Sequence, residues 1–98
     1  GYKIKEEDWA SATYDEKVNF VSLYFMYILQ NYKSYQETLS LTDSPDQATF
    51  SLVKLNLPDE TFRTFESELA ALLEKYHGLS ANHEEVETKR TVSLVIIP

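Results

Sequence analysis

The sequence contains no cysteine, and it has few glycines, prolines and basic residues. The absence of cysteine from 98 residues excludes a disulfide-stabilised scaffold, zinc sites with thiolate ligands and catalysis by a thiol. With only two glycines, the chain lacks the glycine-rich loops that bind phosphates and dinucleotides. Hydroxyl groups are the remaining nucleophiles, and no GxSxG motif presents one of them.

Basic residues are outnumbered by acidic ones. The 9 Lys and Arg residues face 16 Asp and Glu residues, which gives a formal net charge of -7. Lys89 and Arg90 form the only adjacent basic pair, and Glu84, Glu85 and Glu87 precede them. Because phosphate contacts require clustered basic side chains, we do not expect these residues themselves to bind nucleic acid.

Length and composition indicate one small folded domain spanning residues 1–98. Apolar residues make up 43% of the chain and charged residues 26%, which is typical of folded soluble domains. The sequence begins Gly1-Tyr2 without Met, so we expect it to be a fragment of a longer protein. Lys3 and Lys5 are followed by acidic residues instead of an apolar run, so we expect no signal peptide within these residues, and we predict a cytoplasmic location.

A long apolar helix is predicted over residues 14–39. Thr13 and Glu16 match a capping box at its start, and no Gly or Pro interrupts the chain before Pro45. Between Val18 and Leu29 only Asn19 and Ser22 are neither apolar nor aromatic, so the helix needs cover on nearly every side. This run is too short to span a membrane. Because so small a chain can supply little cover, the pattern predicts a partner chain.

The predicted partner is a second copy, which makes the protein a homodimer. One stripe of this helix, at spacings of three and four, consists of Val18, Val21, Phe25, Ile28 and Tyr32. The residues predicted to form the dimer interface are Val21, Tyr24, Phe25, Ile28 and Tyr32. Tyrosines are also common in cores and in ligand pockets, so three roles stay open for Tyr24, Tyr27, Tyr32 and Tyr35.

The second half of the chain predicts a strand, a helix and a strand. Residues 49–57 and 91–97 are rich in β-branched and other apolar residues, which favours strands. Between them, Pro58 opens a helix over residues 58–77 and Gly78 ends it. Its apolar stripe consists of Phe62, Phe65, Leu69, Leu72, Leu73 and Tyr76. The fold class is therefore α+β, with a small sheet of two parallel or antiparallel strands that a partner completes or covers.

Few residues suggest a catalytic or metal-binding role. His77 and His83 with Glu84 or Glu87 offer nitrogen and oxygen ligands for a metal, but an acidic solvated loop explains the same residues better. Glu66, Glu68 and Glu74 fall on the polar side of the second helix, away from any predicted cleft. Residues 1–12 fit an extended entry, at Tyr2 and Ile4, followed by a short helical turn. Trp9 is expected to pack against the following helix, with a binding role as the alternative. We predict no enzyme activity, no cofactor and no metal.

Three stretches carry a resemblance to a known family. They are Tyr2-x-Ile4-x-Glu6-Glu7-Asp8-Trp9, the run from Phe50 to Glu60 that leads into Glu68-Leu69-Ala70-Ala71-Leu72-Leu73, and Val92-Ser93-Leu94-Val95-Ile96-Ile97-Pro98. This layout resembles the region that follows the winged helix-turn-helix in ArsR-like bacterial transcriptional regulators. The resemblance implies dimerisation, in some members sensing of a small-molecule effector, and DNA binding through a winged helix module that these residues do not include.

Together these observations predict the dimerisation and effector domain of a transcriptional regulator. Because this domain is acidic, we expect the winged helix module, and not the domain itself, to contact DNA. Two alternatives stay open. One is a protein-interaction adaptor whose apolar helix docks a foreign partner. The other is a small enzyme that uses tyrosine hydroxyls, although the sequence places no general base beside them.

Overall fold

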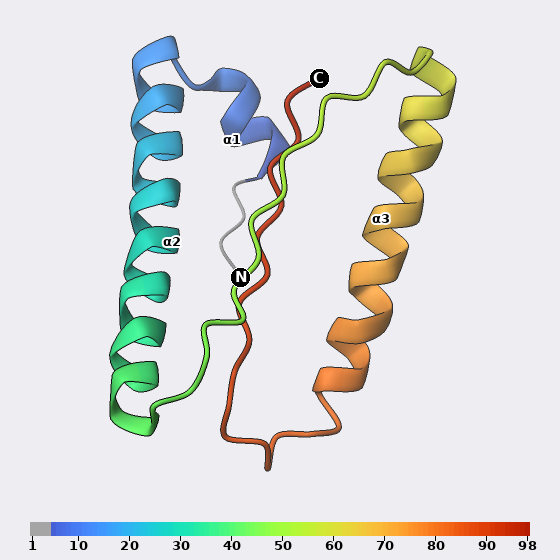
Figure 1. Cartoon of the computed structure of the whole chain (residues 1–98). Coiled ribbons are helices and arrows are strands. Elements are labelled where there is room, and N and C mark those ends of the chain that lie inside the picture. The colour runs from blue at the N-terminus through green and yellow to red at the C-terminus, as the bar shows by residue number, and fades with distance from the viewer. Residues whose placement is uncertain (1–4) are drawn as a thin grey trace. The chain divides into compact units, whose positions relative to one another are not determined.

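The computed structural model describes residues 5–98, and within that range it contains three helices joined by irregular segments. They are α1 (Glu6–Ser11), α2 (Tyr14–Thr42) and α3 (Asp59–Ser80), as Figure 1 shows. The short helical turn expected within residues 1–12 is confirmed by α1, which contains Trp9. The extended segment expected at Tyr2 and Ile4 lies outside the described residues.

The start of α2 follows from a local hydrogen-bond pattern. The Thr13 Oγ1 accepts the Glu16 N–H at 3.1 Å, and the Glu16 carboxylate accepts the Thr13 N–H at 2.9 Å. This reciprocal pair satisfies two backbone donors that would otherwise lack a partner. The bond from the Thr13 amide also holds the pKa of the Glu16 carboxyl below its usual value. The predicted capping box and the helix start at residue 14 are confirmed.

The end of α2 lies at Thr42, three residues beyond the predicted end at residue 39. Asp43 adopts the left-handed conformation with φ 53°, which ends the helix. Two hydroxyls of the last turn bond back to it: Ser40 Oγ donates to the Glu37 carbonyl at 2.7 Å and Thr42 Oγ1 donates to the Thr38 carbonyl at 3.2 Å. The helix thus continues through Ser40 and Thr42, past its predicted end.

The bounds predicted for the second helix need two corrections. Pro58 precedes α3 as its N-cap residue instead of forming its first turn, and the helix passes through Gly78 to end at Ser80. Glycine stops a helix when it adopts a positive φ, and no glycine among residues 5–98 does so. Turns from Ala81 onward take over the last carbonyls instead, with the Ala81 N–H donating to the His77 carbonyl at 3.3 Å.

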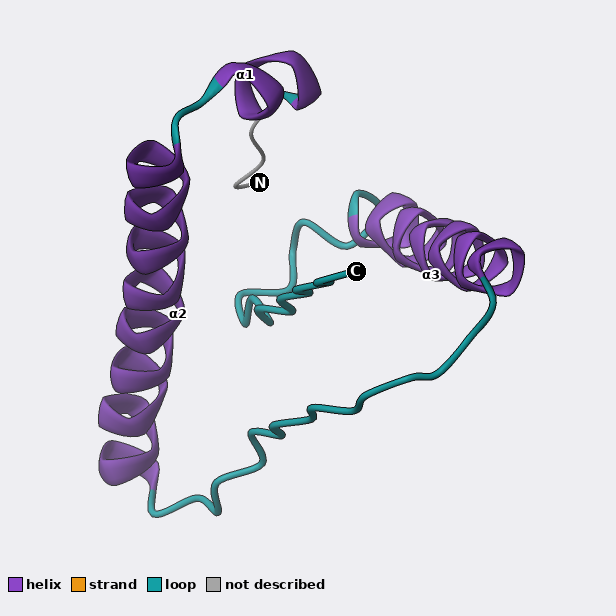
Figure 2. Cartoon of the chain, turned by 90° about the horizontal axis from the view of Figure 1, so that it is seen from above, coloured by secondary structure: helices purple, strands orange, loops and turns teal. Residues whose placement is uncertain are grey.

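The predicted α+β class is wrong for this structure. Residues 5–98 contain no β-strand, and Figure 2 shows residues 49–57 and 91–97 as loop. Apolar and β-branched residues favour an extended backbone, but a strand also requires a neighbouring strand for its ladder. Within the described chain neither segment acquires that neighbour, so both stay single and the structure is all helical.

The chain divides into two structural units. Unit 1 combines Gly1–Ala48 with Thr91–Pro98, and unit 2 is Thr49–Arg90, which contains α3. In unit 1, the Thr91 hydroxyl donates to the Asn31 side chain at 3.2 Å, and Tyr24 bonds to the Ser93 hydroxyl and to the Leu94 carbonyl. The seven-residue step from Tyr24 to Asn31 along the helix and the three-residue step from Leu94 back to Thr91 along the extended segment both span about 10 Å. The C-terminal segment therefore runs antiparallel to α2.

Neither unit encloses a hydrophobic core. Across residues 5–98 no side chain is fully buried, and the apolar residues of α2 and α3 are at best half-buried. In α3 only Phe62, Phe65 and Leu69 of the predicted apolar stripe are half-buried, while Leu72, Leu73 and Tyr76 are exposed. Local backbone hydrogen bonds and side-chain clamps therefore maintain these helices more than burial does.

Substituting Thr13→Ala should destabilise α2 at its N-terminus. The change removes one half of the capping box and should lower the stability of the helix by about 1 kcal/mol. Thermal unfolding followed by circular dichroism at 222 nm measures the loss. Thr38→Ala is the matched control, because Thr38 sits inside α2 and bonds only to the preceding turn at the Ser34 carbonyl. A midpoint for Thr13→Ala no lower than that of Thr38→Ala would contradict the assignment.

Candidate dimer interface on helix α2

One side of α2 is partly covered by its own unit. The half-buried residues follow each other at spacings of three and four, apart from the adjacent pair Asn31 and Tyr32, and they include the two that bond to the C-terminal segment, Tyr24 and Asn31. The full set is Lys17, Phe20, Tyr24, Ile28, Asn31, Tyr32, Tyr35 and Leu39. The C-terminal segment, α1 and the loop after α2 together supply this cover.

An adjacent side of α2 is apolar and open. Its four residues, which we call the outer stripe, are exposed by 48% at Val18, 41% at Val21, 52% at Phe25 and 49% at Leu29. Their spacings of three, four and four place them along one face of the helix. An exposed run of large apolar side chains on one face is typical of a surface that another molecule covers.

The structure divides the five predicted interface residues between these two sides. Val21 and Phe25 belong to the outer stripe, whereas Tyr24, Ile28 and Tyr32 belong to the half-buried side. The hydroxyls of both tyrosines bond within their own chain. The prediction omitted Leu29, although the spacing from Val18 through Val21 and Phe25 leads directly to it.

A hydrogen-bonded clamp fixes the chain where it leaves α2. The Tyr32 hydroxyl and the Gln36 amide both donate to Asp46 Oδ2 at 2.7 Å, and the Ala48 N–H donates to Asp46 Oδ1 at 2.9 Å. In addition, the Gln47 N–H donates to the Tyr35 hydroxyl at 2.7 Å. Three of these bonds hold residues 46 and 47 against α2, and the fourth, from the Ala48 amide to Asp46, fixes the loop itself.

The clamp shifts the titration of its two acidic groups in opposite directions. The hydrogen bond from the Tyr32 hydroxyl, followed by the bond from the Ala48 amide, lowers the pKa of Asp46 below its ordinary value of 3.8. The same bond to the Asp46 carboxylate raises the pKa of Tyr32 above 10.0. The clamp is therefore complete over the whole neutral range, where Asp46 is ionised and Tyr32 is protonated.

The hydroxyls of three tyrosines of α2 form hydrogen bonds within their own chain. Tyr24 bonds to the C-terminal segment, Tyr32 to Asp46 and Tyr35 to the Gln47 amide. Of the three roles left open by the sequence, intrachain packing is the one these contacts support. The carboxylate within hydrogen-bond reach of the Tyr32 hydroxyl is that of Asp46, which is exposed.

The remaining candidate residues lie apart from α2. His83 Nδ1 is 3.3 Å from Glu85 Oε1, with both side chains exposed, and no cluster of three or more possible metal ligands occurs within residues 5–98. Glu66, Glu68 and Glu74 are exposed on α3. Trp9 packs edge to face on Phe20 with ring centroids 5.6 Å apart, which confirms its predicted packing on the following helix.

None of the helices in the described chain has the length and apolar character needed to cross a membrane. The sequence and the structure match no family model, no curated protein and no solved structure. Inference about function therefore rests on the geometry itself and on the resemblance noted from the sequence.

The Ala48 amide should report the titration of Asp46. Because the folded pKa of Asp46 is lowered, the clamp contributes stability above pH 3.8 and loses it as pH falls through the folded pKa. The amide resonance of Ala48, followed by NMR from pH 6 to pH 2, should shift with a midpoint below 3.8. Tyr32→Phe should raise that midpoint. Tyr14→Phe, on an exposed tyrosine at the start of α2, should leave it unchanged. Equal midpoints in the Tyr32→Phe variant and the parent would rule out this origin of the shift.

Proposed function

We propose that this chain is a homodimerisation domain in which α2 packs against α2 of a second copy through the outer stripe. The observation behind this proposal is the open apolar face formed by Val18, Val21, Phe25 and Leu29. The adjacent side of α2, which holds Tyr24 and Asn31, is already covered by the C-terminal segment of the same chain. The outer stripe is thus an apolar face of α2 that its own unit leaves exposed.

A helix pair related by a two-fold axis fits the outer stripe. In such a pair the same residues of both copies face each other, so a stripe of apolar residues is complementary to itself. Phe25 lies in the middle of the stripe and is its largest side chain, which makes it the expected anchor of the contact. The charged residues Lys17, Glu16 and Lys33 lie off this stripe, so the pairing would not bury a charge.

The wider role that we propose is that of the dimerisation and effector part of a cytoplasmic transcriptional regulator. This part of the proposal is supported by the resemblance to the region after the winged helix of ArsR-like regulators. Dimerisation would set the distance between two attached DNA-binding modules, as the spacing of DNA half-sites requires. A winged helix-turn-helix encoded directly before Gly1 in the native gene would support this role, and its absence there would argue against it.

The substitution Phe25→Asp should convert the dimer into monomers. It places a carboxylate in the apolar contact twice, once from each copy, and should raise the dimer dissociation constant at least about 100-fold. Sedimentation equilibrium between 1 µM and 200 µM measures this constant. Gln30→Asp is the matched control, since it introduces the same charge on a different side of α2 and should change the constant less than about three-fold.

Three outcomes are decisive. A parent chain that sediments as a monomer at 200 µM contradicts the homodimer and favours the adaptor alternative. A dimer that Phe25→Asp leaves intact shows that another surface joins the copies. A dimer that both variants weaken equally points to a charge effect without a defined contact. Circular dichroism at 222 nm confirms in each case that the variants keep their helices.

A further inference from the structure

A pocket lies at the corner where α1 meets the first turns of α2. It has a volume of about 500 Å³ and belongs entirely to unit 1. Its lining residues are Asp8, Trp9, Ser11, Ala12, Glu16, Asn19, Phe20 and Leu23. This volume falls in the range of pockets that accept small organic ligands, about 300–1,000 Å³.

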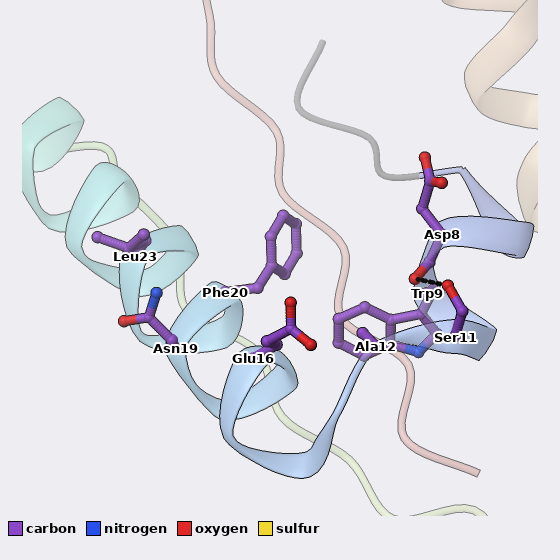
Figure 3. Close-up of a pocket in the computed structure, with 8 residues that line it drawn as sticks. All are labelled: Asp8, Trp9, Ser11, Ala12, Glu16, Asn19, Phe20 and Leu23. Carbon is purple, nitrogen blue, oxygen red and sulfur yellow. Dashed lines mark hydrogen bonds between the residues drawn. The ribbon is translucent and has the colours of Figure 1, made fainter.

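The walls of the pocket combine aromatic and acidic groups. Figure 3 shows the Trp9 ring directed from α1 toward α2, with Phe20 and Glu16 directed from α2 toward it. Trp9 and Phe20 meet at 67° with ring centroids 5.6 Å apart, so the pocket has a continuous aromatic side. Asp8 and Glu16 add two carboxylates, and no basic side chain is among the lining residues.

The aromatic side already attracts a cation. The Lys17 ammonium lies over the Trp9 ring, 5.5 Å from its centroid. A cation at this distance is drawn to the negative face of the indole. The contact is an independent sign that this indole can hold a positive group.

Local bonds give the corner a defined shape. The capping box fixes the first turn of α2 and orients Glu16, whose carboxylate accepts the Thr13 N–H. In α1, the Ser11 hydroxyl donates to the Asp8 carbonyl at 3.2 Å, and the Ala12 N–H donates to the Trp9 carbonyl at 3.2 Å. The lining groups are thus placed by hydrogen bonds within two adjoining helices.

We propose that this pocket binds an organic cation that carries an aromatic ring. The ring would pack against Trp9, Phe20 and Leu23, and the positive group would lie near the carboxylates of Asp8 and Glu16. The site deepens the effector part of the proposed function, because it names the ligand chemistry and the residues that recognise it. It does not depend on dimerisation, since every lining residue comes from unit 1 of one chain.

Trp9 is the only tryptophan of the chain, so its fluorescence reports this pocket directly. Titration of the full chain with benzyltriethylammonium, excited at 295 nm, should give saturable quenching with a dissociation constant of about 1 mM. Benzyl alcohol lacks the charge and tetraethylammonium lacks the ring, so each should bind at least about five-fold more weakly.

Three variants separate a defined site from general charge attraction. Asp8→Asn and Glu16→Gln should each weaken binding by about three-fold, and the double variant by about ten-fold. Glutamine preserves the capping box, so Glu16→Gln should keep the helix signal at 222 nm. Asp15→Asn is the matched control, because it removes one negative charge from the same turn of α2 outside the pocket, and it should leave the constant within two-fold.

The results overturn the proposal in two ways. Quenching that stays linear to 20 mM means that there is no site. Equal weakening by Asp15→Asn and Glu16→Gln means that net charge alone attracts the cation. Sedimentation of the same samples keeps this test apart from the dimer: a dimer without saturable quenching refutes only the pocket, and a monomer that binds the cation refutes only the dimer.

Discussion

The balance between apolar surface and available cover constrains this chain more than any single bond does. A 29-residue helix rich in apolar residues has to be covered on several sides, and unit 1 offers only a short helix, a loop and an eight-residue segment for that purpose. These elements reach the side of α2 that holds Phe20, Tyr24 and Asn31. They do not reach Val18, Val21, Phe25 and Leu29. This shortage of covering elements within unit 1 is the basis of the proposed pairing with a second copy.

Hydrogen bonds at both ends explain how such a helix keeps its bounds without a core. The capping box of Thr13 and Glu16 satisfies amides at the start, and the Asp46 clamp binds the outgoing chain to Tyr32 and Gln36 at the end. Both devices connect residues that are close in sequence, so they form without long-range folding. They define where α2 begins and where the chain leaves it, which leaves the outer stripe free of the chain's own backbone.

Features decided by neighbouring residues could be predicted from the sequence, and features decided by distant partners could not. The capping box and the packing of Trp9 on the next helix depend on a few adjacent residues, and both predictions are confirmed. Residues 49–57 and 91–97 have the composition of strands, but composition does not provide a pairing partner. Gly78 failed as a helix stop because the turns after Ser80 cap the helix without a positive φ.

The candidate interface shows the same distinction. The spacing of Val21 and Phe25 placed them correctly on one helical face, since helical geometry is local. Tyr24 and Tyr32 fell within the same predicted set, but their hydroxyls bind Ser93, Leu94 and Asp46, and no periodicity within α2 indicates those contacts. Hydropathy therefore locates the apolar surface of α2, and only the three-dimensional path of the rest of the chain determines which part of that surface stays open.

The proposed pocket and the outer stripe occupy the same turns of α2, which links the two proposals energetically. Phe20 and Leu23 line the pocket, while Val18 and Val21 begin the outer stripe one residue or two away. A ligand that binds the dimer and the monomer with different affinities must shift the dimer equilibrium by the ratio of those affinities, and dimerisation must shift ligand binding by the same factor. A domain built in this way would sense a cation through its own assembly if the proposed ligand and the proposed second copy contact the same turns of α2.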